Sequence, residues 1–157
     1  MKTNKILVVD DERSVRYALS KVLRAEGYHV VLVENGREAV ERACAERFDL
    51  VLLDLSMPEM NGWEALKEIA TAQPVLPVII ITAHQHQRDW IEPDGAWALM
   101  EKPLNIPLLL VAIREMADGI PSISQRAGAP TKPRFKHWPA DQLSHFNDAS
   151  RPWGINE

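Results

Sequence analysis

The sequence lacks several features that define other classes of protein. Its single cysteine, Cys44, cannot form an internal disulfide, so the chain is not a disulfide-stapled fold. No apolar run approaches the roughly 20 residues that span a bilayer, and the charged first residues do not resemble a signal peptide. We therefore expect a cytoplasmic protein without membrane association, in which Cys44 is a buried, reduced thiol.

Positive charge is also scarce in most of the chain. Residues 1–118 carry 13 Lys and Arg against 19 Asp and Glu, whereas residues 119–157 carry 5 against 3. Contacts with nucleic-acid phosphates need a basic surface, so we do not expect nucleic acid as a partner. The segment Arg134–Trp138 interleaves basic and aromatic residues, a pattern that can stack on bases, but one such pentamer is too little to predict binding.

Short apolar segments alternate with amphipathic ones along the first 118 residues. The expected strands cover residues 5–10, 28–33, 49–54, 77–82 and 97–100, and the expected helices begin near Ser14, Arg37, Trp63 and Asn105. Strands that alternate with helices without long loops form a parallel sheet covered on both faces. The sequence therefore predicts an α/β fold with a doubly wound, five-stranded parallel sheet.

Two regions depart from this alternation. Between Thr82 and Gly95 the chain has room for at most two helical turns before Pro93 interrupts, so we expect a reduced helix four. After residue 120 the composition shifts to a segment with many prolines and little periodicity. We expect one domain over residues 1–118 and a Pro-containing, flexible tail over residues 119–157, which is disordered, docks on a partner or folds back onto the domain.

Polar side chains stand at the ends of four of the expected strands. Asp10 and Asp11 follow the first strand, Asp54 ends the third, Thr82 ends the fourth and Lys102 follows the fifth. Parallel strands bring their carboxyl ends to one edge of the sheet, where ligands of such folds bind. Each residue alone is compatible with ordinary turn chemistry, but together they predict a functional site.

The charges of this site indicate a metal ion and a phosphoryl group. Carboxylates about 4 Å apart repel by roughly 4 kcal/mol per pair at an effective dielectric near 20, so a cluster of three needs a cation. Oxygen ligands favour Mg²⁺, which also binds phosphate oxygens. Lys102 adds a positive charge and Thr82 a hydroxyl donor, so the residues favour a phosphoryl group carried by a carboxylate. His84 and His86 have no third partner at metal-binding spacing and are interpreted as loop residues.

The motifs around these residues resemble the receiver domain of two-component response regulators. The matching pieces are Val8–Asp11, Asp54–Gly62, Thr82–Ala83, Gly95–Ala96 and Lys102–Pro103, and the resemblance covers residues 4–118. It implies a flavodoxin-like sheet with strand order 2-1-3-4-5 and a cis Lys102–Pro103 bond. It also implies a response regulator in a phosphorelay, which accepts phosphate from a sensor histidine kinase or phosphotransfer protein and signals to an unknown protein target. We expect no DNA-binding output domain, because few residues remain.

The resemblance implies a role for each residue of the site. Asp54 is the phosphoacceptor. The ligands of Mg²⁺ would be Asp10, through a water, and Asp11, Asp54 and the backbone carbonyl of Ser56. The phosphoryl group would contact Thr82, the Ala83 amide and Lys102, and its lifetime would be tuned by Ser56 and His84.

Two alternatives stay open beside this hypothesis. An aspartate-nucleophile phosphatase needs a second acid two residues after the nucleophile, where this chain has Ser56, so we expect phosphoacceptance and autodephosphorylation but no enzyme. A phosphorylation-independent binding module is the other alternative.

The chain departs from the receiver pattern at one position. Receivers usually carry Tyr or Phe where this chain has Leu99. Alternation places Trp97 on the same face as Leu99, and Trp97 is interpreted as an ordinary packed aromatic.

Overall fold

The computed structural model describes residues 4–57, 60–83, 95–118 and 136–138. The strands are β1 (Lys5–Val9), β2 (His29–Val33), β3 (Leu50–Asp54), β4 (Val78–Thr82), β5 (Ala98–Glu101) and β6 (Lys136–Trp138). The helices are α1 (Arg13–Ala25), α2 (Gly36–Ala45), α3 (Gly62–Ala72) and α4 (Ile106–Ile113), which continues into the π-helix η1 (Arg114–Asp118). The helix expected between Thr82 and Gly95, with His84 and His86, lies outside the described residues, so α4 denotes the helix that follows β5.

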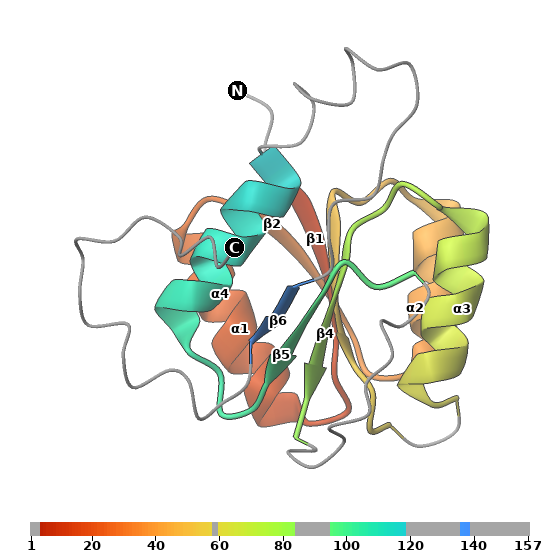
Figure 1. Ribbon diagram of the computed structural model, residues 1–157, viewed down its shortest axis with the longest axis horizontal. Coiled ribbons are helices and arrows are strands. Elements are labelled where there is room, and N and C mark those ends of the chain that lie inside the picture. The colour runs from red at the N-terminus through yellow and green to blue at the C-terminus, as the bar shows by residue number, and fades with distance from the viewer. Residues whose placement is uncertain (1–3, 58–59, 84–94, 119–135, 139–157) are drawn as a thin grey trace, which may run out of the picture.

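The strands form one parallel sheet in the order β2-β1-β3-β4-β5-β6. The order of the first five confirms the doubly wound sheet expected from the sequence. Helices α1 and α4 cover one face of this sheet, and α2 and α3 cover the other (Figure 1). The sixth strand was not predicted: it comes from the segment interpreted as a tail and pairs with β5.

The core has two layers, one on each face of the sheet. Leu7, Leu53 and Ile80 belong to the cluster that packs on α2 and α3. Their neighbours Val8 and Leu52 belong to the opposite cluster, which packs on α1 and α4. Successive side chains of a strand point to opposite faces, so strands buried on both faces read as continuous apolar runs. This burial holds the strand ends, and the polar residues on them, in a rigid frame.

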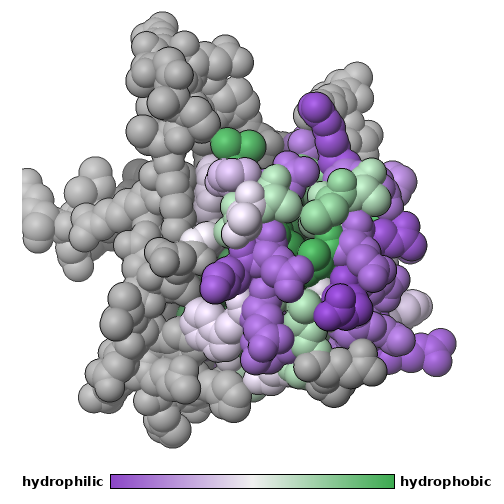
Figure 2. Space-filling model, turned by 90° about the vertical axis from the view of Figure 1, so that its right-hand side faces the viewer, coloured by the Kyte–Doolittle hydropathy of each residue, from purple (hydrophilic) through white to green (hydrophobic). Residues whose placement is uncertain are grey.

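Cys44 is exposed, so the expectation of a buried thiol is wrong. Helix α2 turns Ala39 and Ala43 toward the sheet, where both are buried. The next residue, Cys44, is rotated about 100° around the helix axis and therefore leaves the buried face. It lines a shallow, open depression between α2 and α3 with Val40 and Lys67, on a face where apolar residues form a small area among hydrophilic ones (Figure 2).

None of the helices in the described ranges combines the length and the apolarity that crossing a bilayer requires.

Candidate functional site

The strand register brings the predicted polar residues to one edge of the sheet. Val9 lies opposite Leu53 at the end of the β1–β3 pair, so the next residues of both strands, Asp10 and Asp54, are neighbours. Asp54 lies opposite Ile81 in β4, and the following Thr82 lies opposite Glu101 in β5. The ends of four strands therefore meet where the sequence predicted a site.

Three carboxylates form the acidic centre of this site. Asp10, Asp11 and Asp54 each offer an oxygen atom, and these three atoms lie within 4.8 Å of one another. Asp10 and Asp54 are buried, whereas Asp11 is exposed and opens the cluster to solvent. An all-oxygen donor set with one side open to water fits Mg²⁺, which retains several waters when bound to protein carboxylates.

Lys102 supplies the positive charge next to this acidic centre. Its ammonium donates a hydrogen bond of 3.0 Å to Asp10 Oδ2 and lies 3.6 Å from Asp54 Oδ2. The Lys102 amide donates to the Thr82 carbonyl at 2.7 Å, which ties the end of β5 to the end of β4. The Lys102–Pro103 peptide bond is cis, as the resemblance implied.

The site perturbs the pKa of both Asp54 and Lys102. Burial raises the pKa of Asp54 above its ordinary value, and the charges of Asp10 and Asp11 add to this effect, against the opposing Ser56 amide and Lys102. Burial lowers the pKa of Lys102, but the hydrogen bond to Asp10 and the charge of Asp54 outweigh burial, so its pKa is raised. The folded protein therefore disfavours a charged Asp54 and favours a charged Lys102.

Backbone amides hold the two buried carboxylates in place. Asp54 Oδ1 accepts a hydrogen bond of 3.1 Å from the Ser56 amide, and Asp10 Oδ1 accepts one of 2.8 Å from the Glu12 amide. Each Asp side chain thus accepts a hydrogen bond from the amide of the residue two positions later, which closes a turn that is typical of Asp. These turns restrict the rotation of both side chains and leave the Oδ2 atom of each facing Lys102.

Helix α3 packs directly against the backbone that follows Asp54. The Gly62 amide donates to the Leu55 carbonyl at 3.1 Å. A Cβ atom at Gly62 would lie only 2.5 Å from the Leu55 Cα atom, so glycine is required for this close approach. Asn61 caps the helix, because its side chain accepts from the Glu64 amide at 3.0 Å.

The remaining predicted residues surround this centre. Thr82 is fully buried at the end of β4, whereas Ala83 and the side chain of Ser56 are exposed. The Ser56 amide contacts Asp54, as described above. His84 lies outside the described residues, so its predicted role is not tested.

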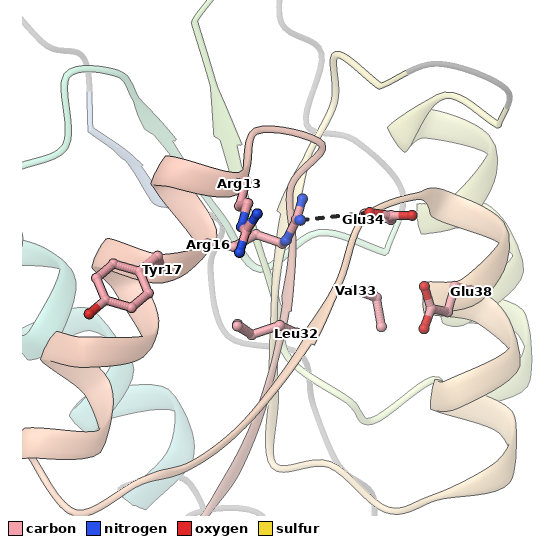
Figure 3. A pocket seen from close by; sticks show the side chains of 7 residues that line it. All are labelled: Arg13, Arg16, Tyr17, Leu32, Val33, Glu34 and Glu38. Atoms are coloured by element: carbon pink, nitrogen blue, oxygen red, sulfur yellow. Dashed lines mark ion pairs between the residues drawn. The ribbon is translucent and has the colours of Figure 1, made fainter.

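Arg16 is a site residue that the sequence reasoning missed. Its Nη1 atom donates to the carbonyl oxygens of Asp10 at 2.7 Å and of Asp11 at 3.0 Å. Its Nη2 atom lies 3.7 Å from Glu34 Oε2, an ion pair that Figure 3 marks with a dashed line. Arg16 and Glu34 line a pocket together with Arg13 and the exposed Tyr17 of α1 (Figure 3). The sequence contained one signal for this contact: Arg16 lies in the first turn of the helix that follows Asp10 and Asp11.

Leu99 and Trp97 pack on opposite faces of the sheet. Leu99 belongs to the cluster with α2 and α3, whereas Trp97 belongs to the cluster with α1 and α4. The prediction that they share a face is wrong, because β5 begins at Ala98 and Trp97 precedes the regular alternation. Trp97 therefore does not substitute for an aromatic residue at position 99.

Comparison with known proteins gives a consistent family match. The model of the response regulator receiver domain family matches residues 6–114. The transcriptional regulatory protein ZraR of Klebsiella oxytoca is 43% identical over 112 residues, which cover 70% of this chain and 25% of that protein. PdtaR of Mycobacterium tuberculosis is 39% identical over 113 residues, which cover 69% of this chain and 54% of that protein. The chain thus matches only a quarter to about half of these relatives' length.

Solved structures match the fold, and two of them contain magnesium. Response regulator TrrA of Thermotoga maritima, solved in complex with Mg²⁺ and BeF, matches with a TM-score of 0.68 and 33% identity over 73% of this chain and 99% of that one. The receiver domain of a sensor histidine kinase from Pseudomonas aeruginosa, with magnesium coordinated in its active-site cleft, matches with a TM-score of 0.69 and 28% identity over 74% of this chain and 98% of that one. The acidic cluster of this chain is like a site for Mg²⁺.

Proposed function

Because the chain belongs to the family of response regulator receiver domains, we propose that it accepts a phosphoryl group on Asp54 from a sensor histidine kinase or a phosphotransfer protein. Receivers of this family are phosphoacceptor signalling modules of two-component systems rather than catalytic enzymes. The observation that carries the proposal is the position of the Asp54 carboxylate, within 4.8 Å of the oxygens of Asp10 and Asp11 and 3.6 Å from the Lys102 ammonium. The proposed metal ligands and the positive charge of Lys102 thus surround the proposed acceptor, Asp54.

The chemistry assigned to Asp54 is nucleophilic. One of its oxygens forms a bond to phosphorus while the bond from phosphorus to the donor's histidine nitrogen breaks. The residues proposed to hold Mg²⁺ are Asp11, Asp54 and the Ser56 carbonyl, with Asp10 acting through a water. The ion, when bound, neutralises the carboxylates and the phosphoryl oxygens.

The remaining residues are proposed to act on the phosphorylated state. Lys102 is close enough to Asp54 to pair with a phosphoryl oxygen, and Thr82 and the Ala83 amide would donate hydrogen bonds to the same group. A phosphoryl group adds up to about two negative charges, so we expect Lys102 to move from Asp10 toward it. Ser56 and His84 are proposed to tune how long the aspartyl phosphate survives.

We further propose that the signal passes on through protein–protein contacts of a receiver domain over residues 1–118. The downstream target is not identified by these residues. The cytoplasmic location and the division of the chain at residue 118 remain predictions.

The proposal is tested with a small-molecule phosphodonor. Incubation with acetyl phosphate and Mg²⁺ is expected to add the mass of one phosphoryl group, measured by intact-protein mass spectrometry. Asp54→Ala should remove the added mass, whereas Asp49→Ala, which removes a carboxylate at the opposite end of β3, should retain it. Chelation of Mg²⁺ should also abolish labelling. Binding of beryllium fluoride with Mg²⁺ is measured in parallel. The proposal would be overturned if the wild-type chain were neither labelled by acetyl phosphate nor able to bind beryllium fluoride.

A further inference from the structure

Strand β6 occupies the outer edge of β5. It lies parallel to β5 at one end of the sheet, with His137 opposite Leu99 and Trp138 opposite Met100 (Figure 1). The edge of a sheet presents N–H and C=O groups with which another extended segment can pair. Residues 136–138 therefore fill a surface suited to docking of an extended strand.

Strand β5 connects this edge to the functional site. Met100, which lies opposite Trp138, precedes Lys102 by two residues. Lys102 in turn lies 3.0 Å from Asp10 and 3.6 Å from Asp54. The residue that contacts both carboxylates therefore lies two residues along the chain from the end of the β5–β6 pairing.

The pairing of β6 is short enough to be reversible. It covers three residues of each strand. The net contribution of a few backbone hydrogen bonds to stability is small. Pro139 follows β6 and has no N–H to extend the ladder. A small structural change in β5 is thus enough to shift the balance between paired and unpaired β6.

We propose that the outer edge of β5 is a regulated strand-docking surface, which residues 136–138 occupy while Asp54 is unphosphorylated and leave when it is phosphorylated. The inference rests on the proposed function of Asp54. The paired state belongs to the arrangement in which Lys102 bonds Asp10, and a phosphoryl group on Asp54 competes for Lys102. Release of β6 frees an edge that an extended segment of a downstream protein can join by β-augmentation.

Phosphorylation of Asp54 and pairing of β6 are linked equilibria in this proposal, so a change in either one should be detectable in the other. If phosphorylation weakens β6 pairing, then weakening β6 pairing must favour the phosphorylated state by the same factor. The amides of Lys136 and His137 point to opposite sides of the strand, so only one of them donates to β5. Proline has no amide N–H, and it is tolerated on an edge strand where that N–H faces away from the sheet. Lys136→Pro and His137→Pro are therefore compared, each in the full chain. One of them removes an N–H that donates to β5, and the other, whose N–H faces away from β5, is its matched control.

The probe is beryllium fluoride with Mg²⁺, titrated against the wild type and both variants. One variant should bind the probe about fivefold more tightly than the wild type, and the other should bind within about twofold of it. Hydrogen exchange of the wild-type β5 amides should also accelerate when the probe binds, a readout that needs no variant. Equal affinities of all three proteins, an equal gain in both variants, or unchanged exchange would overturn the inference. If the wild type binds the probe but gives any of these results, the inference about β6 fails and the proposed function of Asp54 stands. If the wild type does not bind the probe, both proposals fail.

Discussion

Lys102 bridges two carboxylates that belong to different strands: its ammonium lies 3.0 Å from Asp10 Oδ2, beyond the end of β1, and 3.6 Å from Asp54 Oδ2, at the end of β3. Since Lys102 itself follows β5, the ion pairs tie three strand ends together. The lysine occupies the position from which it can neutralise either the carboxylates or a phosphoryl group on Asp54. Its side chain is 22% exposed, so these pairs are partly screened by solvent.

Removal of the Lys102 charge should destabilise the metal-free protein. In Lys102→Met the carboxylates keep their mutual repulsion and lose their counter-charge, so we expect a loss of about 1–3 kcal/mol in the free energy of unfolding, below the range for a fully buried pair. Because a bound cation replaces the missing charge, Mg²⁺ should stabilise the variant more than the wild type. Urea denaturation with and without Mg²⁺ measures both effects. Lys67→Met, an exposed lysine of α3, is the control, and equal stabilities of the two variants would contradict the prediction.

Neutralising Asp54 should stabilise the metal-free fold, with a defined pH dependence. Burial raises the pKa of Asp54 above the unfolded value of 3.8. The stability that this shift contributes is full below that value and is lost as pH rises through the folded pKa, because the buried carboxylate then ionises. Asp54→Asn should therefore be more stable than the wild type at neutral pH, where the buried carboxylate of the wild type is ionised, and should gain nothing at low pH. Thermal unfolding across this pH range measures the gain.

The control for this experiment is Asp49→Asn. Asp49 accepts a hydrogen bond from the Lys5 amide at 2.8 Å, at the opposite end of the sheet, and an asparagine oxygen can accept the same bond. No gain at neutral pH is expected there. A stabilisation of Asp54→Asn that persists unchanged at low pH would show that its cause is not the buried charge.

Arg16 should act as a positioning residue for the metal ligands. It donates to the carbonyl oxygens of Asp10 and Asp11, and outer-shell contacts of this kind are worth about tenfold or more in metal affinity. Arg16→Met should therefore weaken Mg²⁺ binding about tenfold in calorimetric titrations, and Arg16→Lys should recover part of the loss. Arg24→Met is the matched control, because Arg24 lies on the same helix and bonds the Val30 carbonyl away from the site. Equal Mg²⁺ affinities of Arg16→Met and Arg24→Met would refute the role.

Gly62→Ala should disturb the site by forcing α3 away from the backbone after Asp54. A Cβ atom there would lie 2.5 Å from Leu55 Cα, and such overpacking costs about 1–3 kcal/mol. We expect a lower urea midpoint together with slower labelling by acetyl phosphate. Gly27→Ala separates this effect from backbone strain: Gly27 has a φ of 90° but no atom near its added Cβ, so it should lose stability without affecting labelling. Normal labelling of Gly62→Ala would contradict the steric argument.

Local patterns in the sequence predicted the elements near the site well. The apolar runs that end at Val9, Asp54 and Thr82 became β1, β3 and β4, because strands buried on both faces need no alternation with polar residues. Helix α4 begins next to Asn105, near the expected start, and the Asn105 side chain caps it by accepting from the Leu108 amide at 2.9 Å. These features depend on neighbours within a few residues, and such neighbours are visible in a sequence.

Predictions that depended on packing direction were less successful. The exposure of Cys44 depends on which side of α2 meets the sheet, and the sequence pattern of Ala39, Val40 and Ala43 left that angle ambiguous by about one residue. The faces of Trp97 and Leu99 depended on where β5 begins, and strand boundaries set by pairing with β4 are not marked in the sequence.

Residue types at the strand ends were enough to predict the chemistry of the site. Carboxylates, a hydroxyl and a lysine at these positions predicted an acidic, Mg²⁺-binding site around Asp54, because parallel strands place their carboxyl ends at one edge. How the site is held in place, and which distant segments contact it, became visible only in the folded chain. The bonds from Arg16 to the loop of Asp10 and Asp11, and the pairing of residues 136–138 with β5, join groups through geometry that no local pattern encodes. Such contacts form because the folded chain brings donors and acceptors within about 3 Å of one another, which is a property of the assembled sheet and helices.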